Sequence, residues 1–140
     1  MKTTCISHSA KETEQYGADL ASKVKGGTVI ALYGDLGMGK TAFVRGMASV
    51  LSPNAEAQSP TFSLVNVYPG KPSLVHFDMY RIGSWEDLYS TDFFEYIDAG
   101  EIVATEWSEN IEAALPKQTI RVRISRLSET ERSIEMEGEF

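Results

Sequence analysis

Cysteine is almost absent from this sequence of 140 residues, which has Cys5 and no other. A single cysteine excludes a disulfide within the chain, so we expect the protein to work in a reducing compartment. Long hydrophobic runs are also missing, since no apolar stretch approaches the roughly 20 residues that span a bilayer. The first residues carry no hydrophobic core of a signal peptide. Together these absences predict a cytoplasmic protein with no membrane association.

Histidine and basic residues are scarce as well, and both shortages restrict the possible ligands. The two histidines, His8 and His76, do not have metal-ligand spacing, so a metal here is expected to be Mg²⁺ on oxygen ligands. Against 20 acidic residues the chain has 13 lysines and arginines, which gives a net charge of −7. Such a surface repels a nucleic-acid backbone. If RNA is involved, we expect another protein to hold it.

A glycine-rich segment between a predicted strand and a predicted helix is the strongest signal in the chain. Its residues match the phosphate-binding loop pattern: Gly34, Asp35, Leu36, Gly37, Met38, Gly39, Lys40 and Thr41. Glycines allow backbone N–H groups to surround a polyphosphate, the lysine contacts the β- and γ-phosphates, and the threonine hydroxyl can bind Mg²⁺. We expect Lys40 to be largely free of core packing. ATP is the expected nucleotide, because the chain has no Asn-Lys-x-Asp segment for guanine.

The remaining hydrophobic pattern predicts one α/β domain, residues 1–140, with a P-loop NTPase-like three-layer fold and a mixed, mainly parallel central sheet. Strands are expected over residues 2–6, 28–33, 61–68, 73–77, 101–105, 119–124 and 132–136. Ser9 and Glu12 predict a capping box for a first helix, which Gly26-Gly27 is expected to end. The phosphate-loop helix is expected over residues 41–51. Residues 85–96 have helical spacing, with a division at 90–92 as an alternative. The strand at 101–105 is expected to end in Glu106-Trp107, and a loop is predicted from there through Pro116.

Two acidic residues follow apolar strands and are candidates for the metal site. Asp78 comes after residues 74–77 and Glu106 after residues 102–105. In P-loop proteins a carboxylate at the end of a neighbouring strand reaches Mg²⁺ directly or through water, and ligand sites lie at the carboxyl ends of parallel strands. Either residue could instead only cap a loop. His76 is interpreted as a buried, hydrogen-bonded residue, with a catalytic role as the alternative.

Thr61 stands between the phosphate-loop helix and a predicted β-hairpin. In nucleotide switches, residues at this place sense the γ-phosphate. The alternative interpretation is an ordinary threonine at the start of a strand.

Four segments, in this order and spacing, resemble the bacterial TsaE family: residues 34–41, Ser59-Pro60-Thr61-Phe62, His76-Phe77-Asp78-Met79-Tyr80-Arg81 and Glu106-Trp107. The resemblance implies a cytoplasmic single-domain ATPase of P-loop fold in threonylcarbamoyladenosine modification of tRNA. Its implied partners are TsaB and TsaD, with tRNA reached only through that complex and ATP hydrolysis permitting repeated turnover. Two departures are Met38, where the family commonly has alanine, and Ser108, where proline often follows Glu-Trp. The second departure leaves the shape of that loop open.

The same resemblance implies roles for individual residues. It makes Thr41 and Glu106 the Mg²⁺ ligands and places Asp78 near the γ-phosphate. It puts Trp107 and Arg132 beside the nucleotide, together with the residues of the phosphate loop. The residues expected to act in catalysis are Lys40, Thr61, Asp78 and Glu106.

Two other functions stay open on the residues alone. A small-molecule kinase would use the same loop and Mg²⁺ but hold an acceptor in place of water. It would need an acceptor pocket and usually a lid, and 140 residues leave little room for either. A nucleotide-binding module without hydrolysis would lack water-positioning groups, whereas Thr61, Asp78 and Glu106 are available for that role.

Overall fold

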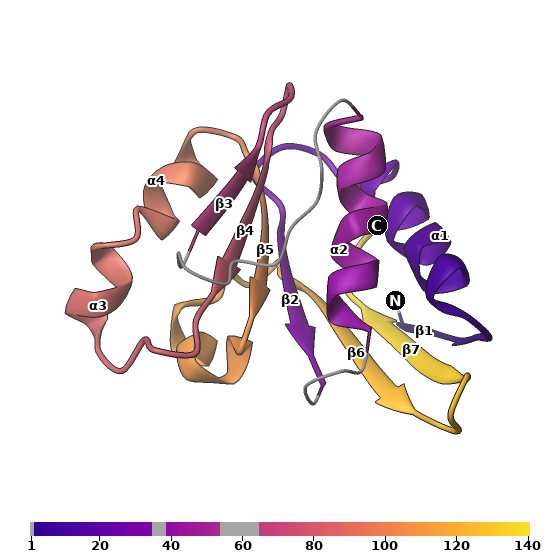
Figure 1. Cartoon of the computed structure of the whole chain (residues 1–140). Coiled ribbons are helices and arrows are strands. Elements are labelled where there is room, and N and C mark those ends of the chain that lie inside the picture. The colour runs from indigo at the N-terminus through magenta and orange to yellow at the C-terminus, as the bar shows by residue number, and fades with distance from the viewer. Residues whose placement is uncertain (1, 35–38, 54–64) are drawn as a thin grey trace.

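The computed structural model describes residues 2–34, 39–53 and 65–140. Its strands are β1 (Lys2–Ser7), β2 (Val29–Tyr33), β3 (Val65–Tyr68), β4 (Leu74–Asp78), β5 (Ile102–Glu106), β6 (Ile120–Arg126) and β7 (Arg132–Glu137). Its helices are α1 (Ala10–Ala21), α2 (Lys40–Leu51), α3 (Trp85–Tyr89), α4 (Phe93–Asp98) and the 3₁₀ helix η1 (Ser108–Ala114). The strands form one sheet with the order β1-β7-β6-β2-β5-β4-β3, and helices cover both of its faces (Figure 1).

The four strands at the centre of the sheet run parallel. β2 pairs with β5 and β6, and β4 pairs with β5, whereas the β1–β7, β6–β7 and β3–β4 pairs are antiparallel. The predicted mixed sheet of a P-loop NTPase-like fold is therefore confirmed, with the parallel pairs at its centre and the antiparallel pairs toward its edges. The parallel strands all end at one edge, the lower one in Figure 1. Open α/β sheets bind their ligands at this edge.

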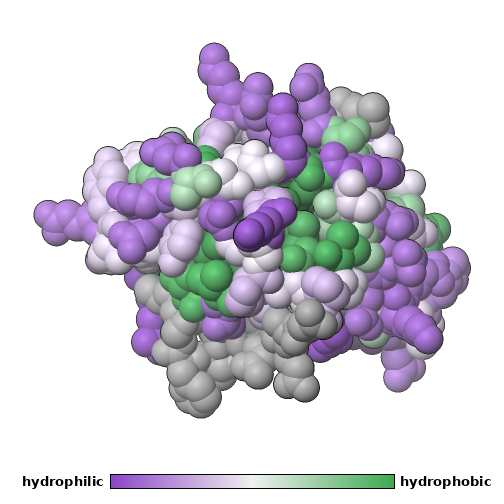
Figure 2. All heavy atoms as spheres, turned by 90° about the horizontal axis from the view of Figure 1, so that it is seen from above, coloured by the Kyte–Doolittle hydropathy of each residue, from purple (hydrophilic) through white to green (hydrophobic). Residues whose placement is uncertain are grey.

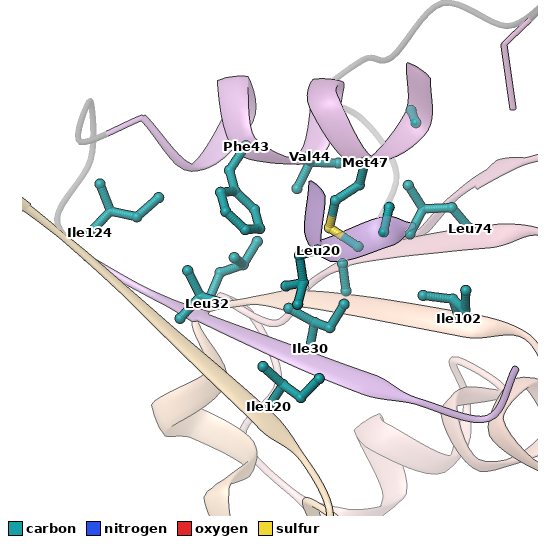
Figure 3. Packing of buried hydrophobic residues seen from close by; sticks show 14 of the residues in the cluster. Leu20, Ile30, Leu32, Phe43, Val44, Met47, Leu74, Ile102, Ile120 and Ile124 are labelled. Atoms are coloured by element: carbon teal, nitrogen blue, oxygen red, sulfur yellow. The ribbon is translucent and has the colours of Figure 1, made fainter. Parts of the chain in front are cut away.

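Alternate residues of the central strands fill two separate hydrophobic layers. On one face, Ile30 and Leu32 of β2 pack beneath Phe43 and Met47 of α2 (Figure 3). On the opposite face, a second cluster joins α3, α4 and η1 to the sheet and contains the fully buried Phe93. A sheet between two layers of helices confirms the three-layer architecture.

Two glycines let α1 and α2 pack with their backbones in contact. A Cβ atom built on Gly17 would lie 2.1 Å from the carbonyl oxygen of Phe43, and one on Gly46 would lie 1.8 Å from that of Glu14. Real side chains do not approach a carbonyl oxygen so closely, so no larger residue fits unless the helices separate. This contact fixes the position of α2, whose first residue is Lys40.

The first helix begins as predicted but ends earlier. Ser9 Oγ accepts a hydrogen bond from the Glu12 N–H at 3.1 Å, which confirms the N-cap. The predicted end at Gly26-Gly27 is wrong, because α1 ends at Ala21. Gly27 has a φ of 87° and belongs to the turn that leads into β2. The glycines therefore shape the entry to the sheet rather than the end of the helix.

In the second half of the chain, one predicted element differs from the structure. Residues 85–96 are divided into α3 and α4, which confirms the alternative of a break at residues 90–92. The prediction of a loop after Glu106-Trp107 and through Pro116 is wrong, because Ser108–Ala114 forms η1. The strand predicted over residues 61–68 can be compared only from Val65, where β3 begins, since the part before it lies outside the described residues.

Hydrophilic and hydrophobic residues are mixed on the face at the amino ends of the parallel strands (Figure 2). The opposite edge, where these strands end, holds Lys40, Asp78 and Glu106. Of the helices that the structure describes, none is long and apolar enough to cross a membrane.

Candidate functional site

Glycines stand at the end of β2 and at the start of α2. Gly34 and Gly39 have φ values of 143° and 111°, a conformation that glycine adopts far more readily than other residues. Within the described residues, no side chain caps the start of α2. Such a helix start is suited to bind an anion. The loop residues between them, Asp35, Leu36, Gly37 and Met38, lie outside the described residues, so their predicted roles stay predictions.

Lys40 places its charge at this edge of the sheet. Its Nζ donates a hydrogen bond to the Gly34 carbonyl at 2.6 Å and lies 4.0 Å from Glu106 Oε1. Only 7% of the side chain is exposed, so the expectation that Lys40 is largely free of core packing is wrong. The side chain is buried because two acceptors at the ends of β2 and β5 hold its ammonium group between the strands.

Glu106 ends β5 and lies opposite Asp78, the last residue of β4, in the parallel register. Its side chain is 13% exposed. Burial alone raises the pKa of the Glu106 carboxyl, but the nearby His76 and Lys40 outweigh burial and lower that pKa below its ordinary value. The group is therefore an ionised carboxylate at neutral pH and can offer a hard oxygen ligand to a cation.

His76 lies two residues before Asp78 on β4, so both side chains point to the same face of the sheet. The ring is fully buried, as predicted. Its Nε2 lies 2.7 Å from Glu106 Oε2. Neither ring nitrogen makes a well-aligned hydrogen bond with a described residue. The expected hydrogen bond thus takes the form of a short polar contact with Glu106.

Asp78 stabilises the turn that follows β4. Its Oδ1 accepts a hydrogen bond from the Tyr80 N–H at 3.0 Å, and the Met79 N–H donates to the Glu106 carbonyl at 3.0 Å. Asn110 of η1 secures the same turn by donating from Nδ2 to the Met79 carbonyl at 2.9 Å. Asp78 therefore does cap a loop, and it does so beside Glu106. No local pattern in the sequence pointed to Asn110.

Trp107 holds its ring between the turn and the lysine. Its ring centroid lies 4.8 Å from that of Tyr80 and 5.7 Å from Lys40 Nζ. Its φ of 58° is left-handed, which costs a non-glycine residue about 1–3 kcal/mol. The next residue, Ser108, is fully buried, and its Oγ lies 2.7 Å from Thr105 Oγ1, 3.0 Å from the Thr105 carbonyl and 3.2 Å from the Leu32 carbonyl. These contacts hold the chain after Trp107 against β5 and β2 and give the loop shape that the departure at Ser108 left open.

Arg132, at the start of β7, lies beside the start of α2. It lines a cavity of about 380 Å³ whose other lining residues are His8, Ser9, Ala10, Thr13, Gly39, Ala42, Glu129 and Thr130. Its Nη1 donates to the Ser128 carbonyl at 2.9 Å, which holds the guanidinium at the β6–β7 turn. Because Gly39 belongs both to this cavity and to the predicted phosphate loop, the two regions are continuous.

The described residues contain no group of three or more His, Cys, Asp and Glu that could hold a metal by itself. A cation at this edge therefore needs other oxygen donors, and Thr41, the second residue of α2, can supply a hydroxyl. Thr61 lies outside the described residues, and its predicted role stays a prediction.

The sheet lies between two layers of helices, and the helix that follows Gly39 starts beside the acidic ends of its parallel strands. This arrangement is the P-loop NTPase-like fold class. Within that class the chain belongs to the TsaE family. Residues 7–134 match the family described as "Threonylcarbamoyl adenosine biosynthesis protein TsaE". The family takes part in the biosynthesis of threonylcarbamoyladenosine in tRNA.

Individual relatives agree with this assignment over most of their length. A TsaE protein of Treponema pallidum is 35% identical over 130 residues, which cover 93% of this chain and 96% of that protein. One from Synechocystis is 42% identical over 110 residues, or 76% of this chain and 69% of that protein. The crystal structure of Bacillus subtilis YdiB superposes with a TM-score of 0.79 at 28% identity, covering 99% of this chain and 86% of that one.

Proposed function

We propose that this protein binds ATP together with Mg²⁺, hydrolyses the terminal phosphate bond, and acts with TsaB and TsaD in the threonylcarbamoyladenosine modification of tRNA. The observation that supports this most directly is the convergence of Lys40, the start of α2 and the Glu106 carboxylate at one edge of the sheet. A cation, a helix start that attracts anions and an oxygen ligand for a metal are what a nucleoside triphosphate with Mg²⁺ requires. We place the activity in the cytoplasm, as the family resemblance implies.

Lys40 is the phosphate-binding residue in this proposal. Its ammonium already lies between the Gly34 carbonyl and Glu106, so little side-chain entropy remains to be lost when a phosphate binds. Because the side chain is buried, its attraction for a phosphate is screened less than that of a surface lysine.

Thr41 and Glu106 are the residues that would hold Mg²⁺. A hydroxyl and an ionised carboxylate are hard oxygen donors, and nucleotide sites bind Mg²⁺ through one or two carboxylates together with phosphates and water. When bound, Mg²⁺ neutralises the negative charge that develops on phosphate oxygens. We assign Asp78, which ends the strand next to that of Glu106, a position near the γ-phosphate. Thr61 is assigned the role of sensing that phosphate.

The nucleoside is assigned to the region around the Arg132 cavity and Trp107. The cavity is continuous with the phosphate loop through Gly39 and is lined in part by polar groups of Ser9, Thr13 and Arg132. Trp107 is 37% exposed and offers a ring face close to Lys40. Either surface can contact a base or ribose next to a phosphate held by α2.

Binding of ATP and release of phosphate test the proposal. Lys40→Ala is expected to weaken ATP binding about 10- to 100-fold, the size of one or two hydrogen bonds to a charged group, and to abolish hydrolysis. Lys117→Ala is the matched control, since Lys117 is exposed and precedes β6 at the opposite edge of the sheet. Circular dichroism verifies the fold of each variant. Unaltered ATP affinity and hydrolysis in Lys40→Ala would contradict the phosphate-loop assignment.

The partner assignment is tested separately. Phosphate release is measured with and without TsaB and TsaD, and with a panel of small hydroxyl and phosphate acceptors. Stimulation by TsaB and TsaD supports the proposal, whereas transfer to a small acceptor identifies a kinase. With a net charge of −7, the isolated chain is expected not to bind tRNA tightly. Tight binding of tRNA by the isolated chain would contradict an indirect role.

A further inference from the structure

His76 is an unusual residue for the interior of a sheet. Among the described residues, it is the one buried side chain whose polar atoms have no well-aligned hydrogen bond. Leu74, two residues earlier on the same face of β4, belongs to the hydrophobic cluster beneath α2. An apolar residue would suit that layer better, since a buried polar group costs free energy unless it is paired. The presence of an imidazole here therefore calls for a specific reason.

The polar neighbour of His76 is Glu106, and the contact distinguishes the two carboxylate oxygens. Oε2 lies 2.7 Å from His76 Nε2, on the buried side. Oε1 lies 4.0 Å from Lys40 Nζ, on the side of the predicted phosphate loop. Ala104 is the register partner of His76 on β5, and its small side chain leaves room for the ring to reach Glu106.

We propose that His76 is a positioning residue: it holds Oε2 of Glu106 from inside the sheet, so that Oε1 faces the side on which phosphates and Mg²⁺ bind. This inference rests on the proposed function, because it assigns His76 a role toward a metal that Glu106 would ligate. A carboxylate at the end of a strand can adopt several rotamers, and a partner that holds one oxygen selects among them before a cation arrives. Partners that orient a metal ligand typically change metal affinity about 10- to 100-fold.

Three substitutions of His76 separate orientation from simple packing. His76→Leu keeps apolar bulk without a nitrogen, His76→Asn keeps polarity but is too short to reach Glu106, and His76→Gln keeps an N–H donor near the place of Nε2. Val75→Ala is the control, because Val75 is fully buried on the same strand but belongs to the cluster on the opposite face. Thermal unfolding of each variant shows which proteins are folded under the conditions of the titrations.

The measurement is the affinity for adenylyl imidodiphosphate, by calorimetry, as a function of Mg²⁺ concentration and in the presence of a chelator. Mg²⁺ should increase the affinity for the nucleotide analogue, and we record the Mg²⁺ concentration that gives half of this increase. We expect that concentration to rise about 10-fold or more in His76→Leu and His76→Asn, because Glu106 is no longer oriented. His76→Gln should stay closer to the wild type. Affinity in the presence of chelator should be unchanged in all three, because the metal ligand matters only when the metal is there.

Several outcomes would overturn the inference. One is a wild-type Mg²⁺ midpoint in folded His76→Leu; should that variant not fold, the same result in His76→Asn has the same meaning. Another is an equal rise of the Mg²⁺ midpoint in Val75→Ala, which would indicate that any disturbance of packing at β4 weakens the response to Mg²⁺. If Glu106→Ala loses the Mg²⁺ dependence and the His76 variants keep it, only this inference fails. If the wild type shows no tightening by Mg²⁺, the proposed function fails as well.

Discussion

The contact between α1 and α2 allows a quantitative prediction, because Gly46 has no space for a side chain. In Gly46→Ala the new Cβ would start 1.8 Å from the Glu14 carbonyl oxygen. An ordinary contact needs about 3.4 Å, so the two backbones must part by the difference, about 1.6 Å. Both partners are helical backbone, which cannot rotate away as a flexible side chain can. The clash must therefore be relieved by moving one helix over the sheet.

Two terms of opposite sign decide the result of this substitution. Replacing glycine by alanine inside a helix stabilises it by about 1 kcal/mol. Overpacking in a rigid interior costs about 1–3 kcal/mol, and a clash between two backbones belongs at the upper end. The expected net loss in the free energy of unfolding is therefore about 2 kcal/mol. At this chain length the midpoint of thermal unfolding falls by about 8 °C, at about 4 °C per kcal/mol.

Thermal and urea unfolding of Gly46→Ala test this prediction beside a matched glycine. Gly83→Ala is the control, because a Cβ at Gly83 would lie 3.8 Å from Asp87 Oδ2, an ordinary contact. We expect that control to change the free energy of unfolding by no more than about 0.5 kcal/mol. ATP affinity should fall along with stability in Gly46→Ala, since α2 begins with Lys40. A Gly46→Ala protein as stable as the wild type would refute the backbone contact.

Three further predictions concern single side chains. Burial and the hydrogen bond to Glu112 raise the pKa of Tyr33 to about 12. The contribution of Tyr33 to the free energy of unfolding should therefore be complete below pH 10 and be lost as the pH rises toward 12. Phenolate absorbance and the pH dependence of unfolding test this, and Tyr33→Phe should lack the loss of stability at high pH. Ser108→Ala should lower the free energy of unfolding by about 1–3 kcal/mol, because it removes a fully buried hydroxyl that bonds to the Leu32 carbonyl. An unchanged urea unfolding curve would show that this hydroxyl does not stabilise the fold. Thr61→Ala should keep much of the nucleotide binding but lose stimulation of phosphate release by TsaB and TsaD; normal stimulation would exclude Thr61 as the sensor.

Local patterns predicted the elements whose residues interact with near neighbours in sequence. The Ser9 cap is such a case, because its partner Glu12 is three residues away. The helix η1 is the opposite case, since distant contacts stabilise it: Asn110 bonds to the turn after β4 and Glu112 bonds to Arg121 of β6. No periodicity in residues 108–116 encodes those partners, which is why a loop was the prediction there.

In the candidate site, too, the positions of residues along the chain could be predicted, whereas their contacts with distant residues could not. The ends of apolar strands identified Asp78 and Glu106 and placed both at one edge, and the register confirms that they lie side by side. Sequence could not predict the contact between Glu106 and His76, because it depends on the distance between residues of two neighbouring strands. The same limit explains the error about Lys40. Its ammonium group contacts the Gly34 carbonyl, just after β2, and the Glu106 carboxylate at the end of β5, and the second of these partners is distant in the sequence.

The segment after Glu106 is attached to the strand that leads into the phosphate loop, and this attachment explains how two distant stretches form one site. Ser108 bonds to the carbonyl of Leu32, two residues before Gly34. Glu112 of η1 bonds to the Tyr33 hydroxyl and to Arg121 of β6, whose Nη2 lies 2.6 Å from Glu112 Oε1. The strand before the loop and the segment that carries Glu106 and Trp107 are therefore joined through Leu32 and Tyr33, the last two residues of β2.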